Sequence, residues 1–209
     1  MNVFKRVVLL CTMGLLINTF SVSASVILTD YSGGSTFGIY WGGSTGDVVG
    51  YKFTANENLT VTSLGVTDAS DQVLTSAHWV GLWEVSSQNL LASILVDSGD
   101  TLLNGFHFAD LSSSVFLNSG SDYLLGALYA NDDGDSYVSS PSSVTANHIT
   151  ILNGVYATSG SLGLVYPQGD SSNLARIGPN MIATITQVPG PETLGLIGLS
   201  MLAMRRFRK

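Results

Sequence analysis

The stretch from Ser25 to Val188 is punctuated by turn residues and contains no apolar run with helical spacing. Asn-Gly or Asp-Gly pairs stand at 104–105, 133–134 and 153–154, next to short segments rich in β-branched and aromatic residues. Both residues of such a pair tolerate positive φ, which tight two-residue hairpins require. A helix would instead need apolar residues every three to four positions over ten or more residues. The middle of the chain therefore predicts many short strands joined by tight turns.

Within the predicted strands, apolar and polar residues alternate. In residues 50–54 the aromatic rings of Tyr51 and Phe53 take one face and Lys52 the other, whereas the alternation in residues 59–66 slips near Ser63, which predicts a β-bulge. Trp79 and Trp83 lie four apart, so they share one face of a strand. We expect strands at residues 26–29, 36–41, 48–54, 59–66, 79–85, 90–96, 101–103, 106–108, 115–117, 123–129, 149–152, 155–158 and 181–186.

These strands occupy a length suited to one domain. The stretch from Ser25 to Val188 has 164 residues, with no linker or repeat to divide it. We predict an all-β fold, a single β-sandwich of jelly-roll type at residues 25–187, with an up-and-down barrel as the alternative. A signal helix before it and a short apolar helix after it complete the expected architecture.

Charge divides the chain in the same way. Six of the eight basic residues lie in the two ends, whereas the stretch from Ser25 to Val188 has two basic and fourteen acidic residues, a formal charge of −12. Such a charge argues against nucleic acid or anionic lipid as a partner of the middle. It is compatible with divalent cations and with a hydrated matrix.

Residues 1–24 have the pattern of a secretory signal peptide. Lys5 and Arg6 precede an apolar run at 7–17, and the segment closes with small or short residues before the predicted cleavage between Ala24 and Ser25. The sole cysteine, Cys11, lies inside this run, so the mature chain would have no thiol and no disulfide. Signal peptidase is therefore the first expected partner.

Residues 188–209 form a three-part tail. A Pro-rich motif precedes an apolar segment at 194–204, and a basic stop ends the chain. The apolar segment would make a helix of roughly 17 Å, while a bilayer core is about 30 Å thick. Basic residues stay cytoplasmic, so both ends place the acidic middle across the membrane. The motif is Val188, Pro189, Gly190, Pro191 and Glu192, and the basic stop is Arg205, Arg206, Arg208 and Lys209.

This tail resembles the PEP-CTERM sorting signal of Gram-negative bacteria. The family usually has Val-Pro-Glu-Pro, whereas this chain has Gly190 in place of the acid, which is displaced to Glu192. The resemblance implies that the chain is held transiently in the inner membrane, cut by an exosortase-like membrane protease or transpeptidase, and delivered to the cell envelope, outer surface or extracellular matrix. Residues 51–54, 61–65, 78–83 and 90–93 are also similar to a β-sandwich module that precedes such tails and has no assigned activity.

Catalytic motifs are missing from the sequence. It has no nucleophile elbow, no paired metal-binding histidines and no phosphate-cradling glycine loop. His78, His107 and His148 lie roughly 30–40 residues apart, without the short spacing of metal ligands. We therefore predict no catalytic residue and a non-enzymatic envelope or matrix protein. A hydrolase whose residues converge only in three dimensions is the most distant alternative.

Two features support a second alternative, a carbohydrate-binding module for surface polysaccharide. Asp132, Asp133 and Asp135 surround a Gly turn and are candidate Ca²⁺ ligands. A solvated hairpin tip would have the same residues, because Asp and Gly also favour turns. The sequence therefore predicts no cofactor other than this candidate Ca²⁺. Trp41, beside two glycines, is the candidate for stacking on a sugar ring. Exopolysaccharide is the partner that this alternative implies.

Overall fold

The computed structural model describes residues 23–38, 46–130, 133–158 and 163–186. This part of the chain is all-β and contains no helix, which confirms the all-β part of the predicted fold class. Consistent with that, none of the described residues belongs to a helix able to cross a bilayer. The expected signal and tail helices, the sorting motif at 188–192 and the basic stop lie outside the described residues.

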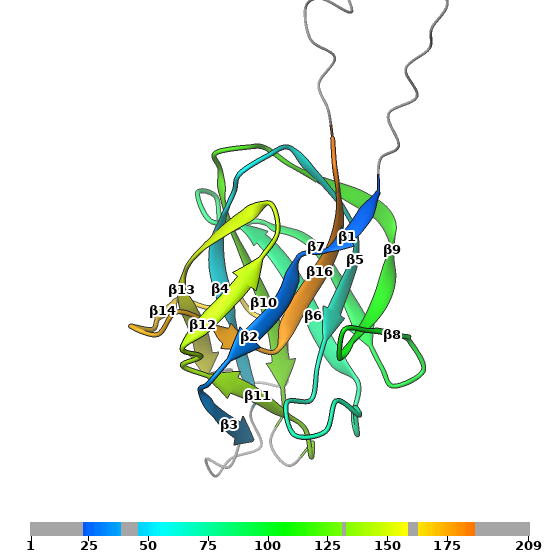
Figure 1. Ribbon diagram of the computed structural model, residues 1–209, viewed down its shortest axis with the longest axis vertical. Helices are drawn as coiled ribbons and strands as arrows, with labels where there is room; N and C mark the ends of the chain where they lie inside the picture. The colour runs from blue at the N-terminus through cyan, green and yellow to red at the C-terminus, as the bar shows by residue number, and fades with distance from the viewer. Residues whose placement is uncertain (1–22, 39–45, 131–132, 159–162, 187–209) are drawn as a thin grey trace, which may run out of the picture.

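Two antiparallel sheets form the body of the molecule (Figure 1). The larger sheet has the strand order β14 (Gly169–Asp170), β13 (Ile149–Thr158), β4 (Asp47–Ala55), β10 (Asp122–Tyr129), β6 (His78–Glu84) and β7 (Leu90–Val96). The second has the order β1 (Ala24–Val26), β16 (Pro179–Ile185), β5 (Leu59–Val66), β9 (Phe106–Leu117) and β8 (Thr101–Leu103).

Two small sheets complete the structure. One contains β15 (Arg176–Ile177), β11 (Ser136–Ser139) and β3 (Ser35–Gly38), and the other pairs β12 (Ser143–Ala146) with β2 (Leu28–Ser32). The start of β2 is fastened to β16 by a buried side chain. Asn180 accepts the Leu28 amide at 3.0 Å and donates to the Leu28 carbonyl at 2.9 Å, as a neighbouring peptide group would.

The main core lies between the two large sheets. Alternation along β4 turns Tyr51 and Phe53 inward, where both are fully buried, while Lys52 lies on the opposite face and pairs with Asp170 of β14. Leu64 of β5 and Leu82 of β6 belong to the same buried cluster. The sandwich is therefore built by the period-two pattern that its sequence displays.

A second, smaller apolar cluster covers the outer face of the six-stranded sheet. Trp83 is buried there with Val48, and Tyr166 meets its ring edge-on at a centroid distance of 6.2 Å. A Cβ atom on Gly81 would lie 2.4 Å from the Trp83 ring, so the indole needs the glycine beneath it. Trp79 shares this face, as predicted, but its side chain is 43% exposed.

The turn predictions have mixed outcomes. Asn104 and Gly105 join β8 to β9 with φ of 52° and 78°, the predicted hairpin. The predicted hairpin at Asn153–Gly154 is wrong, because β13 runs through both residues. β4 offers a continuous partner along this strand, and a bulge between Ile151 and Asn153 absorbs the extra residue, so no chain reversal is needed.

Two further expectations concern register. The bulge expected near Ser63 is confirmed, since the pairing of β5 with β9 shifts between Val61 and Ser63. Gly134 has the positive φ of a turn, at 87°, but the strands on either side of it belong to different sheets and do not pair. The Asp133–Gly134 turn therefore redirects the chain between layers and does not form a hairpin.

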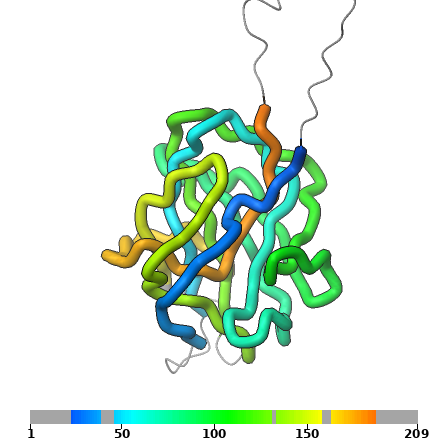
Figure 2. The backbone as a smooth tube through the Cα atoms, in the orientation of Figure 1, coloured from blue at the N-terminus to red at the C-terminus, as the bar shows by residue number. Residues whose placement is uncertain are grey.

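The two ends of the described chain leave the sandwich at the same pole (Figure 2). This follows from the antiparallel pairing of β1 with β16, in which Ala24 stands opposite Thr184. Ala24, the residue before the predicted signal cleavage, is thus the first residue of a strand. Segments that precede and follow the domain consequently start close together.

Candidate functional site

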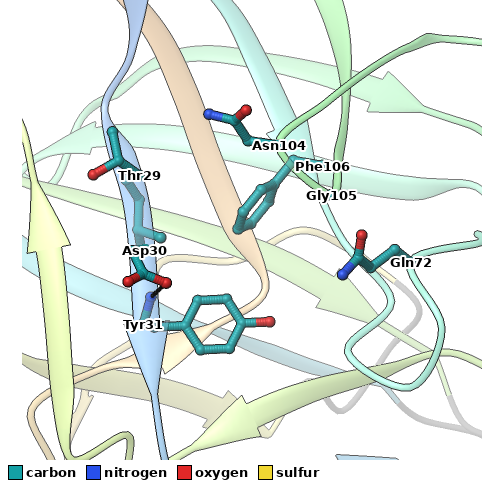
Figure 3. Close-up of a pocket in the computed structure, with 8 residues that line it drawn as sticks. Thr29, Asp30, Tyr31, Gln72, Asn104, Gly105 and Phe106 are labelled. Carbon is teal, nitrogen blue, oxygen red and sulfur yellow. Dashed lines mark hydrogen bonds between the residues drawn. The ribbon is translucent and has the colours of Figure 1, made fainter.

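A polar cleft opens between β2, the 67–77 loop and the β8–β9 turn (Figure 3). Its volume is about 320 Å³, at the lower end of the range of roughly 300–1,000 Å³ for small-molecule sites. β2 supplies residues 28–31, the loop supplies Gln72, and the turn supplies residues 104–106. Three segments that are distant in sequence therefore build one site.

Polar side chains enter the cleft from each of these walls. Asp30 accepts the Tyr31 amide through Oδ1 at 2.9 Å, and its other carboxylate oxygen has no donor among the described residues. The amide groups of Gln72 and Asn104 likewise make no hydrogen bond to another described residue, and both side chains are exposed. Figure 3 shows Tyr31 extending from β2 toward Gln72. The cleft thus presents hydrogen-bonding groups that the protein itself leaves unused.

Two apolar side chains lie beneath the surface of the cleft. Leu28 is fully buried and Phe106 is 3% exposed, so both belong to the main core as well as to the cleft. Tyr31 is half-buried above them, and its burial, reinforced by the negative charge of Asp30, raises the pKa of its phenol. The phenol is therefore neutral at physiological pH and offers one hydroxyl donor.

Backbone contacts hold the walls of the cleft in place. Thr67 Oγ1 donates to the Gly105 carbonyl at 2.6 Å, which ties the β8–β9 turn to the 67–77 loop. Within that loop the Gln72 amide donates to the Asp68 carbonyl at 2.9 Å, and Gln72 takes a φ of 65°. A left-handed conformation costs a residue with a long side chain about 1–2 kcal/mol, so the packing of the loop must enforce it.

A second polar cluster lies buried behind the loop. His78, 1% exposed, donates through Nδ1 to the Leu128 carbonyl at 2.9 Å, and its Nε2 lies 2.7 Å from Asp135 Oδ2. Asp135, 2% exposed, also accepts the amides of Thr75 at 2.8 Å and Ser76 at 2.9 Å. This carboxylate therefore fastens the end of the 67–77 loop and the start of β6 to the turn at 133–135.

The geometry assigns a charge to His78. A carbonyl oxygen can only accept, so Nδ1 carries a proton, and an ionised Asp135 requires a second proton on Nε2. Burial alone would lower the pKa of His78, but its hydrogen bonds to Asp135 and Leu128 and the charge of nearby Asp133 outweigh burial and raise it. Burial would raise the pKa of Asp135, and the donors around it lower it instead. The two residues form a buried ion pair.

The predicted calcium ligands are used in other ways. Asp133 accepts the Ala130 amide at 2.6 Å and the Asp135 amide at 3.1 Å, and Asp135 is committed to His78. Asp132 lies outside the described residues. Within the described ranges no group of three or more His, Cys, Asp or Glu side chains is arranged to hold a metal ion. Calcium at this turn stays a prediction.

Other predicted site residues fall in different places. Ala24 and Ser25 lie at the start of β1, whereas Trp41, the predicted sugar platform, lies outside the described residues. The other two histidines have different partners from His78: His107 Nε2 lies 3.3 Å from the Gln72 carbonyl oxygen, and His148 Nδ1 lies 3.3 Å from Glu57 Oε1. The three histidines therefore share no site.

Sequence reasoning missed both the cleft and the ion pair. The cleft depends on contacts between residues 28–31, Gln72 and residues 104–106, which no local pattern connects. The ion pair had a weak signal, since Asp133 and Asp135 flank a turn and His78 begins a strand, but their distance in sequence hid the pairing. Only the approach of β6, β10 and the 133–135 turn brings them together.

The sequence was also compared with known proteins. No model of a protein family matches the chain, and no curated protein matches it.

Proposed function

We propose that this chain is a non-enzymatic exported protein of the cell envelope or extracellular matrix, sorted through its C-terminal segment by an exosortase-like system. Residues 1–24 act as the signal peptide, and residues 188–209 hold the chain in the inner membrane until they are cut. We further propose that the sandwich is jelly-roll-like and that a short helix flanks it at each end. The domain of residues 25–187 is the cargo.

One structural observation supports this proposal above the others. The pairing of Ala24 with Thr184 means that both ends of the domain leave from one pole. A cargo that is held first by its signal segment and then by its tail would hang from the same pole in both states. The opposite pole and both flanks of the sandwich would face outward throughout. The signal cut between Ala24 and Ser25 falls within β1, so it would precede the pairing of this strand with β16.

The non-enzymatic part of the proposal is supported by burial. His78 and Asp135 are the types of side chain that acid–base catalysis uses, but they are 1% and 2% exposed and bind backbone groups. A substrate has no access to them. Their contacts instead secure the 67–77 loop and the turn at 133–135, which is a structural role.

The proposal is tested by the intact mass of material recovered from the surface of the producing cells. We expect an N-terminus at Ser25 and a C-terminus between Pro189 and Thr193. A chain that retains the tail through Lys209 would show that the segment is a permanent anchor and would overturn the sorting proposal. Turnover of a glycan or peptide that one polar substitution abolishes would overturn the non-enzymatic part.

A pair of tail variants sharpens this test. Gly190→Glu restores the acid between the two prolines, and we expect its tail to be removed at least as completely as in the natural sequence. Removal of residues 205–209 deletes the basic stop, and we expect the uncut form to accumulate. Equal processing of both variants and the natural chain would contradict recognition of the three-part signal.

A further inference from the structure

We propose that the cleft between β2, the 67–77 loop and the β8–β9 turn binds an uncharged sugar residue of a polysaccharide. The inference does not involve Trp41, which lies outside the described residues, and it does not rest on how the chain is sorted. It rests on the chemistry of the unused polar groups, on the ring of Tyr31 and on the charge of the cleft.

The hydrogen-bonding groups match those of a sugar. Each hydroxyl of a pyranose both donates and accepts, so a site needs donors and acceptors side by side. The free amides of Gln72 and Asn104 provide both, and Asp30 provides an acceptor oxygen. Figure 3 shows these groups around one space, with Asn104 and Gln72 on the side opposite β2.

The apolar surfaces match the other half of a sugar. A pyranose ring has C–H faces, which pack on aromatic rings. Tyr31 is half-buried in the cleft, so part of its ring is open to a ligand, whereas Phe106 is 3% exposed and lies beneath the cleft surface. Figure 3 shows the Tyr31 ring extending from β2 into the space that the polar groups surround. One aromatic ring among several polar groups suits a single sugar ring better than a purely apolar ligand.

Charge restricts the ligand further. Of the charged side chains that the structure describes, Asp30 alone lines the cleft. Among the described residues the Lys and Arg side chains are Lys52, which pairs with Asp170, and Arg176, which donates to Tyr137, and neither lines the cleft. A carboxylate or sulfate group on the ligand would meet Asp30 with no compensating cation. The cleft therefore selects uncharged sugars over uronates.

The site is largely formed in the free protein. The hydrogen bonds of Thr67 to Gly105 and of Gln72 to Asp68 fix two of its walls. A Cβ atom on Gly105 would lie 2.7 Å from the Gln72 side-chain oxygen, so the absence of a side chain at Gly105 leaves room for the Gln72 amide over the turn. Binding then orders few groups, which keeps its entropic cost low.

The test uses the full chain, purified in a detergent that has no sugar headgroup. The probes are the methyl glycosides of glucose, galactose, mannose and N-acetylglucosamine, with methyl glucuronide as the acidic counterpart, titrated by saturation-transfer NMR. We expect saturable binding of at least one uncharged glycoside, with a Kd on the order of 1 mM for a ligand of roughly a dozen non-hydrogen atoms. Methyl glucuronide should bind at least about tenfold more weakly.

Three variants locate the binding. Gln72→Gly and Asn104→Gly each remove a side-chain amide at a position of positive φ, a conformation that glycine adopts without strain. Each should weaken binding about tenfold. Gln88→Gly is the matched control, because Gln88 also has positive φ, at 57°, and lies exposed outside the cleft. It should bind as the natural chain does. Far-UV circular dichroism verifies that all three fold.

Several results would overturn the inference. These are the absence of saturable binding for all four uncharged glycosides, equal binding of methyl glucuronide, and binding that both cleft variants leave unchanged. A chain that is processed as proposed but binds no glycoside would reject the cleft and keep the sorting. Conversely, a glycoside-binding chain with an intact tail would keep the cleft and reject the sorting.

Discussion

Replacement of Asp135 by Asn tests the buried ion pair with His78. The carboxylate offers acceptors to Thr75, Ser76 and His78, whereas an Asn side chain offers one acceptor and one donor. If the Asn side-chain oxygen keeps the hydrogen bond from the Thr75 amide, its NH₂ group faces Nε2 of His78 and the Ser76 amide. His78 can release a proton and accept, but the Ser76 amide is then left without an acceptor.

The magnitude follows from these losses. A buried amide without an acceptor costs about 1–3 kcal/mol, and a hydrogen bond to a charged group contributes about 1.5–3 kcal/mol. We therefore expect Asp135→Asn to lower the free energy of unfolding by about 3–5 kcal/mol at pH 6, the range found when one partner of a buried pair is removed. For a domain of this size that corresponds to a fall in Tm of about 6–20 °C.

The same pair predicts a dependence on pH. Because folding raises the pKa of His78, the stability that its proton contributes is complete below the ordinary histidine pKa and is lost as pH rises through the folded value. The natural chain should therefore lose stability between pH 6 and pH 9. Asp135→Asn should lack this loss, so its deficit should shrink to about 1–3 kcal/mol at pH 9.

Urea unfolding of the full chain in detergent, followed by tryptophan fluorescence at pH 6 and pH 9, measures both effects. Glu57→Gln is the matched control, since Glu57 faces His148 at 3.3 Å in an exposed pair with side chains 45% and 28% exposed. It should change stability by less than about 1 kcal/mol. A variant Asp135→Asn that is as stable as Glu57→Gln, or whose deficit does not depend on pH, would refute the buried ion pair.

Three further substitutions test the packing. Gly50→Ala would place a Cβ 1.9 Å from the Leu125 carbonyl oxygen, so we expect a loss of about 3 kcal/mol or more and a lower Tm by differential scanning calorimetry; an unchanged Tm would contradict the close approach. Asn180→Ala removes both hydrogen bonds to Leu28 and should cost about 2–4 kcal/mol in urea unfolding, whereas a neutral result would show that β2 needs no such fastening. Tyr51→Phe removes a buried hydroxyl that has no partner among the described residues and should raise stability by about 1 kcal/mol in the same assay; destabilisation would reveal a missed partner.

The sequence alone determined the class of the fold and much of its local structure. Turn residues with positive φ and period-two alternation are local signals, because they depend on the backbone of a few residues. They correctly gave the bulge near Ser63, the Asn104–Gly105 hairpin and the inward faces of Tyr51 and Phe53. They failed at Asn153–Gly154, where pairing with β4 outweighed the preference of the dipeptide for a turn.

Tertiary structure alone decided the candidate sites. Residues 28–31, Gln72 and residues 104–106 meet only because β2 is fastened to β16 through Asn180 and the β8–β9 turn is fastened to the 67–77 loop. His78 and Asp135 likewise meet across 57 residues, and that contact sets their charges. Such contacts depend on which strands lie next to each other. The alternation of apolar and polar residues determines which face of a strand is buried, but it does not determine which other strand or loop packs against that face, so the sequence pattern does not predict these contacts.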